Sequence, residues 1–196
     1  MHTNTRLGLA SSLLTMAAFA DIAGRPLQAE RAVEVGPSVM IYGATAEQID
    51  LGRWAVRRFE AAKLEAPPVE IDFHGDAAGC GGHLGFAKAG EVDMCTTLVN
   101  AMARRNLLHE MSHIWLDMNA DASVRERFLE LRGLREWNAS TDPWQERGYE
   151  QGAEIISWAI GERILTAQIP DNDPPQIGAA FEVLTGVAMP APRVEG

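Results

Sequence analysis

Residues 107–115 read Leu-Leu-His-Glu-Met-Ser-His-Ile-Trp, and this stretch predicts a helix with two different faces. With about 100° between successive residues, its apolar side chains fall within an arc of about 120°. His109 and His113 lie roughly opposite that arc. Two imidazoles four residues apart are separated by about 6 Å along a helix, so both can bind one metal ion. The alternative is a helix whose two histidines are satisfied by ordinary hydrogen bonds.

Glu110 lies beside the two histidines on this helix, about 100° from His109. A carboxylate in this place can take a proton from a metal-bound water, which is the usual division of labour in zinc peptidases. The pattern H-E-x-x-H has only three fixed residues, so other parts of the chain must support the interpretation.

A catalytic zinc site needs a third protein ligand and one position open to water. Asp142, Pro143 and Gln145 predict a helix N-terminus, with an N-cap, a proline at the first helical position and the far half of a capping box. The helix is expected over 143–166, and its almost wholly apolar second half indicates burial. Three glutamates at intervals of four share one face of it: Glu146, Glu150 and Glu154. Buried carboxylates need partners such as a metal ion, whereas a solvated acidic stripe is the alternative for these glutamates taken alone.

A helical H-E-x-x-H followed by a second helix with E-x-x-x-D or E-x-x-x-E resembles the gluzincin clan of zinc metallopeptidases. The short chain is most similar to the minigluzincins. The following segments also resemble uncharacterised bacterial proteins of that kind: 107–115, 128–134, 144–150 and 155–158. The resemblance covers roughly positions 35–166, which are therefore expected to form a zincin-like metallopeptidase domain.

The resemblance implies a role for five residues. His109, His113 and Glu150 would bind one Zn²⁺ per chain, and Glu110 would be the catalytic residue that activates a zinc-bound water. Glu154 would accept the other ring N–H of a ligand histidine, which fixes the tautomer of that histidine. Because Glu154 stands where Asp is usual in the family, the roles of Glu150 and Glu154 could be reversed.

The function implied by the resemblance is zinc-dependent hydrolysis of peptide bonds in a peptide or protein substrate. One alternative is a catalytically silent zincin-fold protein that serves in metal binding or interaction, and another is an interaction module without a metal. His74, His83 and Tyr149 are candidates for stabilising the oxyanion of a tetrahedral intermediate. No spacing places either histidine over the metal, so ordinary roles in a loop or hairpin are the alternative.

The composition agrees with a globular protein. A chain of 196 residues with 46% hydrophobic and 22% charged residues can bury one full core. Its net charge of −10 argues against nucleic acid or an anionic membrane as a partner.

Residues 1–20 are expected to be a signal peptide or a disordered arm. The stretch 7–20 is uncharged and mostly apolar, follows Arg6 and ends in Ala-Phe-Ala, an A-x-A cleavage pattern. It is too short to span a membrane. We expect secretion, with a cytoplasmic apolar arm or a misplaced start codon as the alternatives.

Cys80 and Cys95 are the two cysteines of the chain. In an exported protein they would form a disulfide that tethers the strand ahead of the histidine helix. In a cytoplasmic protein they would be free thiols and ordinary small core residues.

The remaining pattern predicts an α+β fold, with an N-terminal mixed sheet and backing helix, then the active-site helix and C-terminal helices. Strands are expected at 38–41, 69–73, 83–87 and 91–95, the last two as a hairpin. Helices are expected at 45–63, opened by a Thr45–Gln48 capping box, and at 98–118, 121–136 and 143–166. The Pro-rich segment 169–175 is expected to end the compact part and leave 167–196 as a tail. The resemblance implies that an edge strand of the sheet binds substrate backbone.

Overall fold

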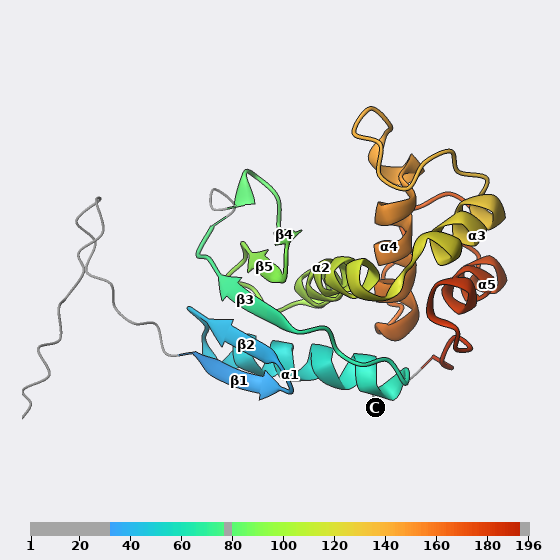
Figure 1. Cartoon of the computed structure of the whole chain (residues 1–196). Helices are drawn as coiled ribbons and strands as arrows, with labels where there is room; N and C mark the ends of the chain where they lie inside the picture. The colour runs from blue at the N-terminus through green and yellow to red at the C-terminus, as the bar shows by residue number, and fades with distance from the viewer. Residues whose placement is uncertain (1–31, 77–79, 193–196) are drawn as a thin grey trace, which may run out of the picture. The chain divides into compact units, whose positions relative to one another are not determined.

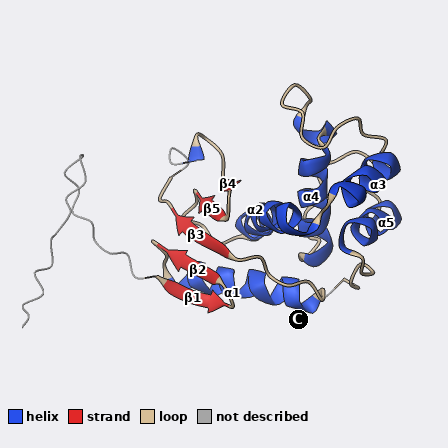
Figure 2. Ribbon diagram, viewed as in Figure 1, coloured by secondary structure: helices blue, strands red, loops and turns tan. Residues whose placement is uncertain are grey.

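A computed structural model describes residues 32–76 and 80–192, which form the predicted α+β fold (Figure 1). A mixed sheet comes first in the chain and a group of helices follows, as Figure 2 shows. The expected signal peptide at 1–20 lies outside the described residues. No helix within the described ranges is both long and apolar enough to cross a membrane.

The sheet has five strands in the order β1-β2-β3-β5-β4. The strands are β1 (Val33–Gly36), β2 (Val39–Tyr42), β3 (Val69–Phe73), β4 (Gly85–Lys88) and β5 (Glu91–Met94). Strands β2, β3 and β5 run parallel, and each outer strand is antiparallel to its neighbour. The expected hairpin is formed by β4 and β5. Strand β1 was not predicted; it is joined to β2 by a tight turn in which Ser38 has a φ of 62°.

Helix α1 (Ala46–Ala61) backs the sheet at β1 and β2. It begins with the predicted capping box, because the Thr45 side chain accepts from the backbone N–H of Gln48 and the Gln48 side chain accepts from that of Thr45. A side chain at Gly52 would put its Cβ 2.2 Å from Cδ1 of Ile41 on β2. Glycine therefore allows the close packing of α1 on the sheet.

Helix α2 (Ala101–Asn119) lies between the sheet and the helices that follow it in the chain (Figure 1). The Asn100 side chain caps its N-terminus by accepting from the backbone N–H of Ala103. One face of α2 packs against β4 and β5, and the helix crosses α4 (Gly148–Ile160) along much of its length. Three residues of its apolar face, Leu107, Leu108 and Met111, are fully buried.

The helix expected over 143–166 is shorter than predicted at both ends. Trp144–Glu146 form a short 3-10 helix, η2, and α4 begins only at Gly148. The predicted N-cap, Asp142, binds the guanidinium of Arg135 instead, and Pro143 has an extended ψ of 149°. At the other end, the guanidinium of Arg58 donates to the carbonyls of Ile160 and Gly161 and satisfies the helix C-terminus there.

The prediction that 167–196 is a tail outside the compact part is wrong for much of that segment. Pro174–Thr185 form helix α5, which packs on α4 and on α3 (Ala122–Arg132). Prolines are favourable in the first turn of a helix, and the Asp173 side chain caps it by accepting from the backbone N–H of Gln176. Ile177 and Phe181 are fully buried, so α5 is part of the core. The predicted domain of 35–166 is therefore too short at both ends.

Candidate metal centre

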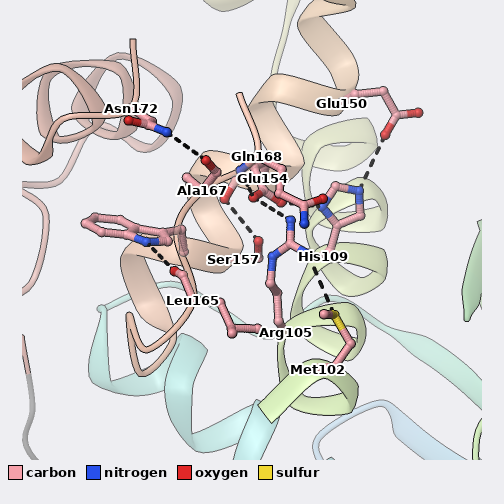
Figure 3. Close-up of polar contacts among 11 residues, drawn as sticks. Met102, Arg105, His109, Glu150, Glu154, Ser157, Leu165, Ala167, Gln168 and Asn172 are labelled. Carbon is pink, nitrogen blue, oxygen red and sulfur yellow. Dashed lines mark hydrogen bonds and ion pairs between the residues drawn. The ribbon is translucent and has the colours of Figure 1, made fainter. Parts of the chain in front are cut away.

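His109 and His113 on α2 face Glu150 in the first turn of α4 (Figure 3 shows His109 and Glu150). Oε2 of Glu150 lies 3.4 Å from Nε2 of His109 and 3.2 Å from Nε2 of His113. The three side chains each offer one ligand atom, and these atoms lie within 4.8 Å of one another. Both histidines are buried, and the Glu150 side chain is 16% exposed. The crossing of α2 and α4 thus forms a group that could hold a metal ion.

Two distances in this group are close to those between neighbouring ligands of one tetrahedral ion. Bonds of about 2.0–2.2 Å to zinc place neighbouring tetrahedral ligands about 3.3–3.6 Å apart. A charge-assisted hydrogen bond would bring imidazole and carboxylate to about 2.7–2.9 Å. The observed separations of 3.2 and 3.4 Å are closer to the edges of a metal tetrahedron. Two imidazole nitrogens and one carboxylate oxygen are also an established donor set for catalytic zinc.

The charge of the group favours a cation. Burial lowers the pKa of His109, but the nearby Glu150 and Glu154 carboxylates outweigh it and raise this pKa to about 9. Burial raises the pKa of Glu150, but its contacts with His109 and His113 outweigh that effect and lower the pKa well below the usual range. Glu150 therefore stays ionised. When no metal is present, the positive charge beside it is that of the protonated His109 imidazole.

Glu154 lies one turn after Glu150 on α4 and contacts the other side of His109. Its Oε2 atom is 3.4 Å from Nδ1 of His109, and its side chain is fully buried. Its Oε1 atom accepts from Nη2 of Arg105 at 2.6 Å and from the backbone N–H of Gln168 at 2.7 Å (Figure 3). Glu150 is thus the carboxylate that reaches both Nε2 atoms. Glu146, the third glutamate of the predicted stripe, is exposed in η2 and takes no part in the group.

Two aromatic rings hold the imidazoles in place. Trp144 stacks on His109 with 5.8 Å between ring centroids, and Tyr149 packs on His113 at 4.2 Å. The Tyr149 hydroxyl lies 3.0 Å from Oδ2 of Asp117, and burial together with Asp117 raises the pKa of Tyr149. The protonated hydroxyl therefore donates to Asp117. Within the described residues, Nδ1 of His113 is buried without a hydrogen-bond partner.

Glu110 lies next to the histidines and against β4. A Cβ atom added at Gly85 would lie 3.0 Å from Cγ and 3.2 Å from Oε1 of Glu110, so the glycine makes room for this carboxylate. Burial raises the pKa of Glu110, although the nearby imidazoles of His109 and His113 act in the opposite direction. A raised pKa moves a carboxylate toward the range in which a general base works near neutral pH.

A cleft opens over the group. It consists of two adjoining hollows of about 400 and 480 Å³. The residues common to both walls are His83, Gly85, His109, Glu110 and Trp144. The first hollow continues along Leu84, Met102 and Asn106, and the second along Phe86, Arg147 and Tyr149. Strand β4 lines the cleft and is the last strand in the sheet order, so its outer edge has no partner strand within the described residues.

A disulfide joins Cys80 and Cys95, which flank the part of the chain that forms this wall of the cleft. It joins the segment before β4 to the residue after β5, and the backbone N–H of Cys95 donates to the carbonyl of Leu84. The segment that carries His83, Leu84 and Gly85 is thereby tied to the sheet. The pairing agrees with the prediction for an exported chain.

The structure separates the three candidates for oxyanion stabilisation. His83 is exposed at the wall of the cleft, near Glu110. Tyr149 lines the same cleft, but its hydroxyl is directed to Asp117. His74 instead pairs with Asp93, with 2.5 Å between Nε2 and Oδ1, and lines neither hollow.

Four contributors to the site were not foreseen from the sequence: Arg105, Trp144, Gln168 and Gly85. Arg105 precedes His109 by four residues, and helical spacing could have placed both on one face. The other three lack such a signal, because their contacts arise between segments distant in the chain.

The chain matches no protein-family model, no curated protein and no solved structure. The class of site therefore rests on geometry: two histidines and a glutamate that could bind a metal, with a further glutamate beside them in a cleft.

Proposed function

We propose that this protein is a zinc-dependent metallopeptidase. The observation that carries the proposal is the approach of one Glu150 oxygen to the Nε2 atoms of both His109 and His113, beside Glu110 in an open cleft. A metal site used only for structure is normally closed by four protein ligands, whereas a catalytic site keeps a position open. The described residues offer three candidate ligands, and a cleft lies beside them.

Zinc, when bound, supplies a Lewis acid that polarises the scissile carbonyl and lowers the pKa of water. Glu110 accepts the proton of the attacking water and passes it to the amine that leaves. The raised pKa of Glu110 suits both steps, since the carboxylate must take up a proton and release it again. Glu154 keeps Nδ1 of His109 protonated, so that Nε2 of this histidine is free to bind the metal.

The substrate is proposed to be a peptide in extended conformation. The outer edge of β4 has no partner strand in the part of the chain that the structure describes, and β4 lines the cleft, so backbone hydrogen bonds from this edge can add the peptide as a further strand. Three apolar side chains on the walls are unusually exposed, namely Leu84 at 44%, Phe86 at 49% and Met102 at 37%. These surfaces favour substrates with apolar side chains near the scissile bond, because burying them removes apolar area from water.

The proposal is tested by metal analysis of the purified protein and by cleavage of a fluorogenic peptide library with apolar residues. We expect about one zinc per chain, lost in His109→Ala and in His113→Ala. Glu110→Gln should keep the zinc and lose at least about 10²-fold in cleavage rate, the usual scale for a general base. Glu146→Gln is the matched control, since Glu146 is exposed and lies outside the group, and it should cleave like wild type.

Three results would contradict this function. Full zinc occupancy in the His109→Ala/His113→Ala double variant would reject the metal centre. Equal cleavage by Glu110→Gln and wild type would reject the role of the base. Zinc at full occupancy with no cleavage of any library peptide would favour a catalytically silent metal-binding protein.

A further inference from the structure

Arg105 lies on α2 one turn before His109 and forms an ion pair with Glu154 on α4 (Figure 3). Nη2 of Arg105 is 2.6 Å from Oε1 of Glu154. The Arg105 side chain is only 14% exposed and that of Glu154 is fully buried. Each of these charges loses its hydration on burial. Close contact between the two groups is needed to compensate for that loss.

The two oxygens of Glu154 have different partners. Oε1 is bound by Arg105 and by the backbone N–H of Gln168, at 2.6 and 2.7 Å. Oε2 lies 3.4 Å from Nδ1 of His109 and has no hydrogen-bond partner within the described residues. Since one oxygen is held by two donors, the carboxylate cannot rotate freely, and its other oxygen stays directed at His109.

We propose that Arg105 is a positioning residue of the metal centre: by holding one oxygen of Glu154, it keeps the other oxygen in place to orient the His109 imidazole. Among the described interactions, Arg105 contacts no proposed ligand atom, and it acts through Glu154. This inference rests on the proposed metal centre and does not depend on peptidase activity. The order of contacts is Arg105 to Glu154 to His109, and the last of these would bind the ion.

The contact with Arg105 also balances the negative charge of the buried Glu154 carboxylate. Without Arg105, Glu154 would be a fully buried carboxylate with one backbone N–H as the remaining donor to Oε1. Such a carboxylate would turn toward other donors or toward water, because an unpaired buried charge is costly. Either movement would release the His109 ring from its second contact.

The neighbouring residue provides a matched control. Arg104 is also on α2 and also pairs with an acidic residue, with 2.5 Å between its Nη1 atom and Oε1 of Glu162. Its side chain is 39% exposed, and Glu162 has no contact with the metal group among the described interactions. Arg104→Met therefore removes the same kind of interaction from the same helix without touching Glu154.

The test measures the rate of zinc loss to an excess of chelator from wild type, Arg105→Met and Arg104→Met. We expect Arg105→Met to lose zinc about 10–100-fold faster, the range for residues that orient a ligand histidine, and Arg104→Met to match wild type. Cobalt substituted for zinc should show altered d–d absorption in Arg105→Met alone, which reports ligand geometry independently of activity. Arg105→Lys keeps a cation beside Glu154 and should restore part of the slow zinc loss.

A double-mutant cycle separates positioning from general stabilisation. If Arg105 acts through Glu154, adding Arg105→Met to Glu154→Gln should change the rate of zinc loss by less than about twofold. An undiminished effect in that background would overturn the inference. So would a lowered Tm of metal-free Arg105→Met together with an unchanged rate of zinc loss. If Arg105→Met does not fold, Arg105→Lys carries the comparison, and zinc loss as slow as in wild type together with an unaltered cobalt spectrum would overturn the inference.

Failure of the inference is distinguishable from failure of the proposed function. A wild-type protein that binds no zinc would reject the metal centre itself. A wild type that binds zinc, with Arg105→Met losing it no faster, would reject only the role of Arg105.

Discussion

Gly85→Ala tests whether the place of Glu110 against β4 matters for the proposed reaction. The added Cβ would lie 3.0 Å from Cγ, 3.2 Å from Oε1 and 3.4 Å from Cδ of Glu110. Carbon atoms in contact prefer about 3.5–4.0 Å, so the Glu110 side chain must move by about 0.5 Å. A displacement of about 1 Å in a catalytic group can cost about 10²-fold in rate. Half of that displacement predicts a loss of about tenfold in kcat.

The fold and the metal should be unaffected by this substitution. Gly85 is in strand β4 and its φ is outside the left-handed region, so alanine fits its backbone without strain. Its replacement should leave Tm equal or slightly higher, since glycine in a strand costs about 0.5–1 kcal/mol relative to alanine. Zinc content should stay at about one per chain, because Gly85 supplies no ligand.

The assay compares steady-state cleavage of one fluorogenic peptide by wild type, Gly85→Ala and Gly75→Ala. Gly75 is the control, since a Cβ atom at that position would meet nothing within 4 Å. Full activity in Gly85→Ala would refute the reasoning, because Glu110 could then not be the group that the reaction requires in this place. Loss of zinc from Gly85→Ala would refute it as well.

The remaining predictions concern the ligands, the pH and the disulfide. Glu150→Ala should weaken zinc binding far more than Glu154→Ala, whose effect should be about 10–100-fold, and competition with a chelating indicator measures both; the opposite order would reverse their roles. The pKa of His109 is raised to about 9 in the metal-free protein. Below that pH the His109 imidazole carries an extra proton, which zinc must displace. Apparent zinc affinity should therefore rise by about tenfold per pH unit from pH 7 to 9 and then level off, and a flat profile would contradict this proton competition. Reduction of the Cys80–Cys95 disulfide, whose partners are 15 residues apart, should lower the free energy of unfolding by about 3 kcal/mol in urea titrations with and without reductant. An unchanged unfolding midpoint under reduction would contradict that expectation.

Elements with a local signal were the most predictable part of the fold. The capping box of Thr45 and Gln48 marks the start of α1 because both of its hydrogen bonds are made between residues three apart. Strand β3 and the β4–β5 hairpin follow from alternation and from the turn between them. The same kind of signal gave a wrong prediction at Asp142. Its side chain pairs with Arg135 and does not cap a helix.

Two consecutive prolines can mark either the end of a compact region or the first turn of a helix. The Pro-rich pattern around Pro174 and Pro175 predicts the end of the compact part, but the two prolines occupy the first turn of α5 after the cap Asp173. The buried residues Ile177 and Phe181 decide between the two interpretations, since α5 packs against both α3 and α4. That place exists only in the folded chain.

By itself, the sequence determined the α+β class and the pairing of His109 and His113 on one helical face, because both depend on periodicity within short segments. It also limited the candidates for a third metal ligand to glutamates spaced four apart, which share a face and cannot be told apart by spacing. The family resemblance placed Glu150 ahead of Glu154 as the expected ligand, but the contacts that distinguish the two carboxylates come from the tertiary structure. The crossing of α2 over α4 brings Glu150 to the Nε2 atoms of both histidines and leaves Glu154 at Nδ1 of His109, held by Arg105. Such choices depend on the angle and register between two packed helices, which no local pattern specifies.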